Sequence, residues 1–177
     1  MSLSEKKVLF IIPNKNFRDK ELIEPRRILE NNKVKTNIAS KTNEICIGML
    51  GTKITPNLTL DKVIINEYEA IIFIGGSGST IYWNDKTALN LAKEAYLKGK
   101  LLCSICLASG TIANTGLLKG KNATGWIDTK ELIEKTGGKY TGKDLEISGR
   151  IITAIGHQVS KQFGEAILKF LENKIDN

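Results

Sequence analysis

The chain has 177 residues, 41% of them hydrophobic and 25% charged, which is enough for one domain with its own core and short for two. It contains neither the roughly 20 consecutive apolar residues of a membrane-spanning helix nor a secretory signal, and an odd number of three cysteines does not suit a disulfide framework. The net charge of +7 comes from lysines and arginines scattered through every segment, which favours a solvated basic surface over a nucleic-acid patch. We therefore expect one cytoplasmic domain over residues 1–177, with no nucleic acid and no membrane as partner.

Apolar runs, capping residues and glycines predict strands that alternate with helices. A continuous apolar run at Lys7–Ile12 predicts a strand that is buried on both faces. Asp19 and Asp85 are predicted to cap the first two helices, and Pro25 is expected to bend the first. In chain order we expect a strand at 7–12, a helix at 19–32, a strand at 34–40, an antiparallel excursion over 44–59, a strand at 70–74, a helix at 85–98, a strand at 101–105, helices at 107–115 and 129–135, a hairpin of 145–148 with 150–154, and a helix at 160–172.

This alternation predicts an α/β fold, with a mainly parallel sheet and helices on both of its faces. Ligands of such folds bind at the carboxyl ends of the strands. Two candidate segments follow strand ends: the loop Gly75-Gly76-Ser77-Gly78-Ser79, and Cys106 after the strand at 101–105.

Cys106 stands between a buried strand and a helix, where a side chain has to project from the top of the sheet. The N–H groups and partial positive charge of a helix N-terminus stabilise a thiolate, and the same N–H groups can hold a developing oxyanion. The turn is similar to a nucleophile elbow, although Ser104 and Ala108 occupy positions that are glycines in that motif. The segment alone is equally compatible with a buried structural thiol.

Two phosphate-binding motifs are incomplete. The glycine loop fails the dinucleotide fingerprint because Ile81 stands where the last glycine should fall, so by itself it predicts a tight turn. Residues 137–143 match the start of a P-loop, but Asp144 replaces the required Ser or Thr, and the segment follows a helix instead of a strand. No phosphate-bearing cofactor is predicted.

A C-x-x-C pair, Cys103 and Cys106, could form a zinc site together with Cys46 and His157. Cys103, however, lies inside a predicted strand, and a spacing of three puts the two side chains on opposite faces if the strand continues. We therefore predict neither a metal site nor a redox dithiol.

Several segments in the same order match one known family: Lys7–Ile12, Glu21-Leu22-Ile23-Glu24-Pro25, Ala70–Gly76, Ser104-Ile105-Cys106, Gly116-Leu117-Leu118-Lys119-Gly120 and Ala123-Thr124-Gly125-Trp126. On these segments the chain resembles the ThiJ/PfpI superfamily, which contains intracellular cysteine peptidases and the parkinsonism-associated deglycase. The similarity runs nearly from end to end.

The resemblance implies a flavodoxin-like three-layer sandwich in which Cys106 is the nucleophile. It also implies that Glu21, which the sequence alone would assign to a solvated helix near the carboxyl edge of the sheet, shares a proton with the sulfur. The backbone N–H groups of Gly76 and Leu107 would form the oxyanion hole. A protonated carboxyl group beside a thiolate can donate a hydrogen bond to it and stabilise it. No cofactor and no metal is implied, and relatives are commonly homodimers.

Two positions depart from the family pattern. The peptidase branch has a histidine directly after the nucleophile, and here that residue is Leu107, so the base that would take the thiol proton is missing. The one histidine, His157, follows Gly156 at a position where relatives often have proline. His157 is therefore a candidate substitute base or substrate contact, although a lone histidine at a helix start is more often a cap or a surface residue.

The leading hypothesis is a stress-response enzyme in which Cys106 attacks small reactive dicarbonyls, or their protein adducts, and Glu21 moves the proton. The second hypothesis is an intracellular cysteine peptidase or amidase that uses Cys106 with His157. The third is a non-enzymatic redox sensor or chaperone, in which oxidation of Cys106 to the sulfinic acid changes partner binding.

Overall fold

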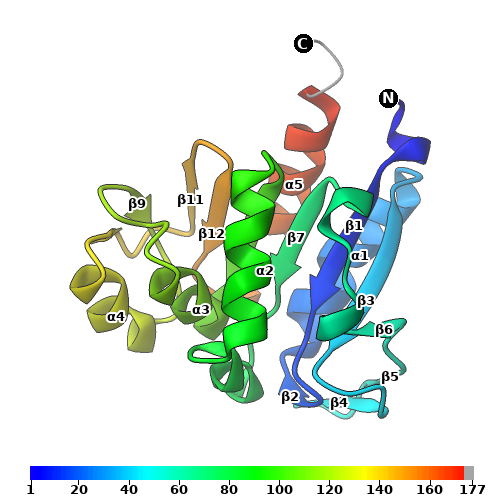
Figure 1. The fold of residues 1–177 in the computed structure, drawn as a ribbon, viewed down its shortest axis with the longest axis horizontal. Coiled ribbons are helices and arrows are strands. Elements are labelled where there is room, and N and C mark those ends of the chain that lie inside the picture. The colour runs from blue at the N-terminus through cyan, green and yellow to red at the C-terminus, as the bar shows by residue number, and fades with distance from the viewer. Residues whose placement is uncertain (174–177) are drawn as a thin grey trace.

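A seven-stranded sheet runs through the centre of the computed structural model, which describes residues 1–173 (Figure 1). The strands lie in the order β11-β12-β8-β7-β1-β3-β6, and β11 alone among them is antiparallel to its neighbour. The strands are β1 (Lys7–Ile11), β3 (Lys35–Ser40), β6 (Leu58–Thr59), β7 (Ala70–Phe73), β8 (Leu101–Ile105), β11 (Leu145–Ser148) and β12 (Ile151–Ala154). The predicted, mainly parallel sheet is confirmed.

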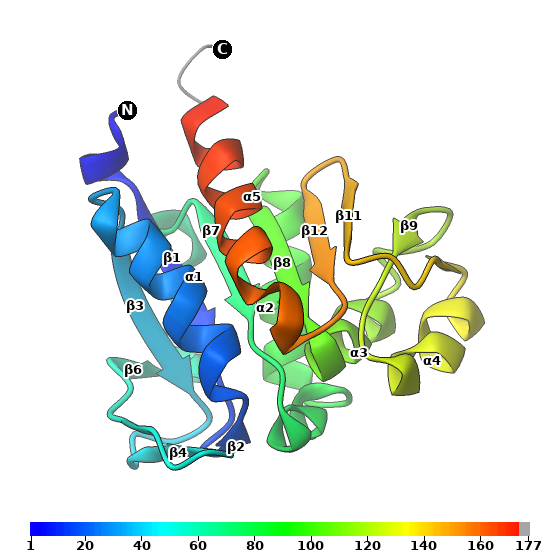
Figure 2. The same cartoon turned by 180° about the vertical axis from the view of Figure 1, so that it is seen from behind.

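Helices cover both faces of this sheet. They are α1 (Asp19–Asn31), α2 (Lys86–Leu97), α3 (Ser109–Asn114), α4 (Lys130–Lys135) and α5 (Ser160–Asn173). α1 and α5 pack together on one face (Figure 2), and α2 lies on the opposite face beside α3. A Cβ atom on Gly164 of α5 would lie 2.8 Å from the Cα of Pro25 in α1, so glycine allows this close helix contact. The arrangement confirms the expected flavodoxin-like three-layer sandwich.

The core lies on both sides of the sheet, which explains why β1 is apolar at successive positions. Val8 and Phe10 belong to the cluster under α1 and α5, whereas Leu9 and Ile11 belong to the cluster under α2. All four side chains are fully buried. Because successive side chains of a strand point to opposite faces, a strand between two helix layers needs apolar residues throughout.

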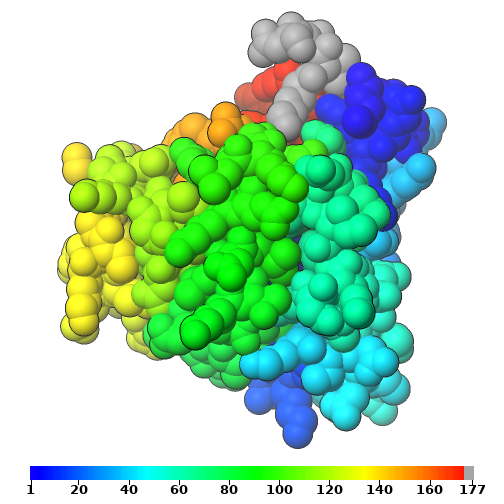
Figure 3. Space-filling model, in the orientation of Figure 1, coloured from blue at the N-terminus to red at the C-terminus, as the bar shows by residue number. Residues whose placement is uncertain are grey.

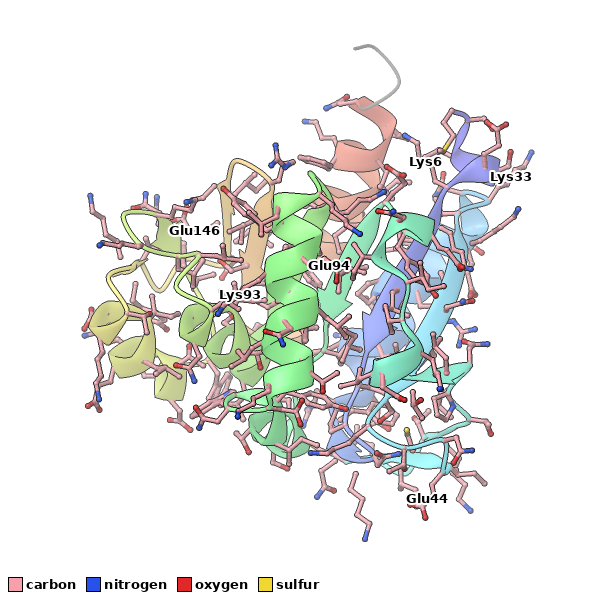
Figure 4. All side chains as sticks on the ribbon, in the orientation of Figure 1. Lys6, Lys33, Glu44, Lys93, Glu94 and Glu146 are labelled. Atoms are coloured by element: carbon pink, nitrogen blue, oxygen red, sulfur yellow. The ribbon has the colours of Figure 1, made fainter. Side chains whose placement is uncertain are left out.

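Charged side chains are distributed over the surface. α2 crosses the middle of the face in Figure 3, and Lys93 and Glu94 follow each other on it (Figure 4). Lys33 and Glu44 lie far apart in the same view. Lys6 is an exception, because it is buried and its ammonium group donates a hydrogen bond to the backbone oxygen of Leu171 in α5. Among residues 1–173 no helix is both long and apolar enough to cross a membrane.

The excursion over residues 44–59 is only partly antiparallel. β4 (Cys46–Gly48) and β5 (Lys53–Ile54) pair antiparallel, but β4 also lies parallel to β2 (Lys15–Phe17), a strand absent from the sequence prediction. β6 leaves the excursion and joins the main sheet beside β3. A further unpredicted pair is β9 (Asn122–Ala123) with β10 (Lys139–Tyr140).

Aspartates were predicted to cap the N-termini of α1 and α2. Asp85 accepts a hydrogen bond from the N–H of Ala88 at 3.0 Å, so it caps α2 as predicted. The predicted cap by Asp19 is wrong, because Arg18 occupies the cap position and Asp19 is the first helical residue. Its carboxylate instead accepts hydrogen bonds from the N–H groups of Leu50 (2.8 Å) and Thr52 (3.0 Å) in the turn after β4. These two donors are more than 30 residues away in the sequence, so no local pattern around Asp19 predicts the contact.

The predicted helix at 107–115 begins as a 3-10 turn, Cys106–Ala108, and continues as α3. The predicted hairpin at 145–154 is confirmed as β11 and β12. The prediction of one domain over residues 1–177 extends to residues 174–177, which lie outside the described residues.

Candidate active site at the carboxyl edge of the sheet

Cys106 follows β8 directly and has a backbone φ of +61°. A positive φ is rare and strained for a residue with a Cβ atom, and such strain is concentrated at functional sites. Ile105 before it is extended, with φ −135° and ψ 142°, and the 3-10 turn begins at Cys106 itself. The chain therefore reverses direction at the cysteine, as at a nucleophile elbow.

Two serines, one on each side of the turn, bond to each other. The hydroxyl groups of Ser104 in β8 and Ser109 in α3 lie 2.9 Å apart, and both side chains are fully buried. This contact joins the strand to the helix across the turn. The N–H of Trp126 also donates to the backbone oxygen of Cys106 at 3.2 Å, which ties a second loop to the turn.

Glu21 of α1 lies fully buried next to the cysteine. Its Oε2 accepts a hydrogen bond from the N–H of Gly75 at 2.9 Å. Its Oε1 is also buried and has no hydrogen-bond partner among the described residues, and the side chain of Cys106 lies close enough to the carboxyl group to affect its pKa. Oε2 is thus engaged as an acceptor, which leaves Oε1 as the atom that can carry a proton toward the sulfur.

Burial raises the pKa of Glu21 to about 8, although the neighbouring Cys106 side chain, the hydrogen bond from Gly75 and the charge of Arg18 oppose this effect. Burial and the negative charge of an ionised Glu21 raise the pKa of Cys106 to about 12, against the N–H groups of Leu107 and Gly76. Loss of both protons would place two negative charges in one buried site. The pair therefore keeps at least one proton near neutral pH.

Glycine is required at both positions of the loop after β7. A Cβ atom on Gly75 would lie 2.5 Å from Glu21 Oε2 and 2.7 Å from the Cβ of Cys106. Gly76 has a φ of +103°, and a Cβ there would lie 2.4 Å from the nitrogen of Arg18, whose N–H donates to Gly75. The loop can therefore bring its backbone against both reactive side chains.

The N–H groups of Gly76 and Leu107 both act on the sulfur of Cys106. Donors that converge on a nucleophile can also stabilise an oxyanion that forms on the carbon it attacks. Their assignment as an oxyanion hole stays a prediction, as do the catalytic roles of Cys106 and Glu21.

A cavity of about 200 Å³ opens above the cysteine, and it is lined by Arg18, Glu21, Met49, Gly76, Ser77, Cys106, Leu107, Trp126 and His157. The predicted site residues, which come from four separate segments, thus share one cavity. Sequence reasoning missed Arg18, Met49, Ser77 and Trp126 as members of its wall. Arg18 and Ser77 follow segments that end at the carboxyl edge of the sheet, and this position is the signal that could have found them.

His157 begins a 3-10 turn, His157–Val159, and is half-buried in the cavity wall. Burial is the largest cause that lowers its pKa, and the positive charges of Arg18 and Lys20 lower it further. The imidazole is therefore neutral at pH 7, and among the described residues no hydrogen bond joins it to the sulfur of Cys106. Its role as a base stays a prediction.

The other two cysteines lie away from this cavity. Cys103 is fully buried inside β8, and burial raises its pKa well above the usual value. Cys46 lies in β4, where its sulfur accepts a hydrogen bond from the side-chain amide of Asn14 at 3.5 Å. Within residues 1–173, no group of three His, Cys, Asp or Glu side chains is arranged to hold a metal ion.

The fold and the site define an α/β protein with one cysteine at a strained strand-to-helix turn and a buried carboxyl group beside it. The family model described as DJ-1/PfpI family matches residues 6–170. The chain belongs to the DJ-1/PfpI family.

Known proteins similar to this chain are found among archaea and bacteria. An uncharacterized protein of Methanocaldococcus jannaschii is 38% identical over 174 residues, which are 97% of this chain and 85% of that protein. The protein named Deglycase PfpI of Pyrococcus furiosus is 26% identical over 148 residues, 84% of this chain and 89% of its own length. The crystal structure of a ThiJ/PfpI domain protein from Brachyspira murdochii, 26% identical, matches with a TM-score of 0.93 over 98% of this chain and 99% of that chain.

Proposed function

We propose that this protein is a cysteine-dependent stress-response enzyme that acts on small reactive dicarbonyls or their protein adducts. The observation that carries the proposal is the strained Cys106 beside the protonated, buried Glu21 in a small cavity. The deglycase name of the Pyrococcus furiosus relative supports the same reaction class at 26% identity.

The first step is addition of Cys106 to the aldehyde carbon of a dicarbonyl such as methylglyoxal. The sulfur forms a bond to the carbon, the C=O π electrons move to oxygen, and the pair's proton neutralises that oxygen. The product is a hemithioacetal. The N–H groups of Gly76 and Leu107 stabilise the charge that develops on the oxygen during addition.

The second step moves a proton from the aldehyde carbon to the neighbouring carbon through an ene-diol, and Glu21 is the group that carries it. This converts the hemithioacetal into a thioester, which water hydrolyses to lactate and free Cys106. The net reaction adds one water to methylglyoxal. It needs no oxidant and no cofactor, because one carbon of the substrate is oxidised while the other is reduced.

The experiment that tests this proposal is turnover of methylglyoxal to lactate by the wild type, Cys106→Ser and Glu21→Gln. We expect turnover by the wild type, none by Cys106→Ser, and a loss of roughly 10² to 10⁴-fold in Glu21→Gln, the usual contribution of a proton-transfer group. Wild-type protein that leaves methylglyoxal unchanged, or Cys106→Ser that retains turnover, would contradict the proposal.

A peptidase is the second candidate, because His157 lines the same cavity as Cys106. It would need His157 to protonate a leaving amine. A fluorogenic peptide panel run beside the methylglyoxal assay separates the two candidates.

The proposed setting is the cytoplasm, since Cys46, Cys103 and Cys106 are all free thiols. The proposed assembly is a homodimer. Alternating exposure along β4 supports it. Ile45 and Ile47 point outward, with 56% and 43% of their surface exposed. Cys46 and Gly48, which alternate with them, are buried. An outward apolar stripe on a strand is typical of a covered surface.

A further inference from the structure

Arg18 contributes a positive charge to the wall of the cavity that contains Cys106. Its backbone is fixed on both sides: its own N–H donates to Gly75 at 2.9 Å, and Asp19 after it is tied to the turn after β4. Phe17 before it is fully buried. The base of the Arg18 side chain therefore has a defined position at the start of α1.

Among residues 1–173, the guanidinium of Arg18 has no hydrogen-bond or ion-pair partner that would account for this position. Its Nε is buried without a hydrogen bond, and within residues 1–173 no carboxylate forms an ion pair with it. A buried N–H donor is normally satisfied, and an unsatisfied one calls for a partner that binds there. Glu21, the carboxyl residue of the cavity wall, interacts with the charge of Arg18, but within residues 1–173 the two form no ion pair.

The cavity around Arg18 is electropositive. Burial, the charge of Arg18 and the charge of Lys20 together lower the pKa of His157, so the imidazole is neutral and does not compete for an anion. Glu21, protonated at neutral pH, does not neutralise the guanidinium either. Planar guanidinium binds carboxylate through two parallel hydrogen bonds, and such charge-assisted bonds are the strong ones.

The geometry points to Arg18 as the residue that selects anionic aldehydes, by binding a carboxylate group of the compound whose carbonyl carbon Cys106 attacks. The volume of about 200 Å³ suits this class, because it equals roughly six or seven water volumes and holds a molecule of a few heavy atoms. The inference deepens the proposed function, since it takes Cys106 as a nucleophile toward carbonyl carbons.

The covalent step is the reversible formation of a hemithioacetal on Cys106. With glyoxylate, the sulfur of Cys106 bonds to the aldehyde carbon, the π electrons move to its oxygen, and the proton of the Cys106–Glu21 pair is taken up there. The carboxylate stays intact and lies against Arg18. Nothing is oxidised or reduced, so the adduct forms without a further reactant.

The test measures how glyoxylate and its uncharged methyl ester protect Cys106 from alkylation by iodoacetamide. The ester has the more electrophilic aldehyde, so the informative quantity is the ratio of the two half-protection concentrations in each variant. Replacing Arg18 by Gln should shift this ratio against glyoxylate by at least about tenfold, the factor that one charge-assisted hydrogen bond supplies. Arg18→Lys, which keeps the charge but loses the planar fork, should give an intermediate ratio.

Lys93→Gln is the matched control, because it removes one positive charge from an exposed position on α2, outside the cavity wall, and should leave the ratio unchanged. A ratio that Arg18→Gln leaves unchanged, an equal loss with both compounds, or wild-type Cys106 that neither compound protects would overturn the inference.

Methylglyoxal turnover measured on the same samples separates the two proposals. An anion preference that depends on Arg18, found without turnover, supports this inference and defeats the proposed function. Turnover of methylglyoxal without an anion preference that depends on Arg18 supports the proposed function and overturns this inference.

Discussion

The carboxyl group of Glu21 accepts a hydrogen bond from the backbone N–H of Gly75 at 2.9 Å, and the Glu21 side chain is fully buried there. This bond joins the first turn of α1 to the end of β7. A single hydrogen bond to a neutral carboxyl oxygen leaves the other oxygen free to hold a proton against Cys106. The relationship also makes the stability of the fold depend on pH.

Glu21 should make the protein less stable as pH rises. Its pKa in the folded state is raised from 4.5 to about 8, so the folded state holds its proton more tightly than the unfolded chain does. The stability from this proton is complete below about pH 4.5 and is lost as pH rises toward about 8. Wild type should therefore lose up to about 5 kcal/mol of unfolding free energy relative to Glu21→Gln across this range. Urea unfolding of both proteins from pH 4.5 to 8.5 measures the difference, and parallel pH profiles would contradict it.

Cys106 should be the first thiol to react with a limiting amount of iodoacetamide at neutral pH. It is 8% exposed and lines the cavity, whereas Cys46 and Cys103 are completely buried. Burial raises the pKa of all three thiols, that of Cys106 to about 12, so access to the reagent decides the order of labelling. Peptide mass spectrometry after partial alkylation identifies the modified residue. Faster labelling of Cys46 or Cys103 would overturn the assignment of the site.

Gly75→Ala should damage the site more than the fold. The added methyl group would lie 2.5 Å from Glu21 Oε2 and 2.7 Å from the Cβ of Cys106, so the pair has to separate. We expect a stability loss of about 1 to 3 kcal/mol, typical of overpacking, and a change in the alkylation rate of Cys106. Gly149→Ala is the control: it has a φ of +61° and open space around it, so it should cost stability while the alkylation rate stays the same. Equal effects of both variants on the rate would contradict this account.

Most of the fold could be predicted from the sequence because its central strands β1, β7 and β8 are buried on both faces and are therefore mostly apolar. The turn at Cys106 was likewise predicted, since a buried strand runs into a helix there with no linker. Glu21 was different: the residues alone suggested a solvated glutamate, and only the family resemblance put it beside the cysteine. Its burial depends on Gly75, 54 residues away, and no local pattern records such a contact.

The capping error at Asp19 had the same origin. An aspartate before a helical pattern normally caps it, but here two backbone N–H groups after β4 bind the carboxylate. That error also hid Arg18, because the true cap residue faces the cavity. The carboxyl groups of Asp19 and Glu21 are thus both held by backbone N–H groups that are distant in the sequence.

The outward stripe on β4 should hold two copies of the chain together. Leu50, in the turn directly after β4, is 73% exposed and adds to the exposed apolar surface of Ile45 and Ile47. Leu50→Lys and Ile47→Lys should convert a dimer into a monomer, because burying an unpaired charge opposes association. Leu97→Lys is the control, since Leu97 is 81% exposed on α2, away from this stripe. Sedimentation velocity measures the mass. A wild-type monomer at micromolar concentration, or dimers in all variants, would contradict the prediction.

The protein should be a poor peptidase. Peptide hydrolysis needs a nucleophile, an oxyanion hole and an acid that protonates the leaving amine. Leu107 cannot transfer a proton, and among the described residues the carboxyl group of Glu21 accepts one hydrogen bond of regular geometry, from Gly75. His157 lines the cavity, but among the described residues no hydrogen bond joins it to Cys106, and burial, Arg18 and Lys20 lower its pKa, which makes it a weaker base for the thiol proton it would have to pass to the amine.

Losing a general acid costs roughly 10² to 10⁴-fold in rate, or about 3 to 5 kcal/mol of barrier. An aldehyde avoids this loss because addition to it expels no amine. We therefore expect peptide cleavage near background in the same preparation that turns over methylglyoxal through Cys106. The fluorogenic panel should show no difference between wild type and His157→Ala. Strong cleavage that disappears in both Cys106→Ser and His157→Ala would mean that His157 completes a catalytic dyad, and the order of the two candidate functions would then be reversed.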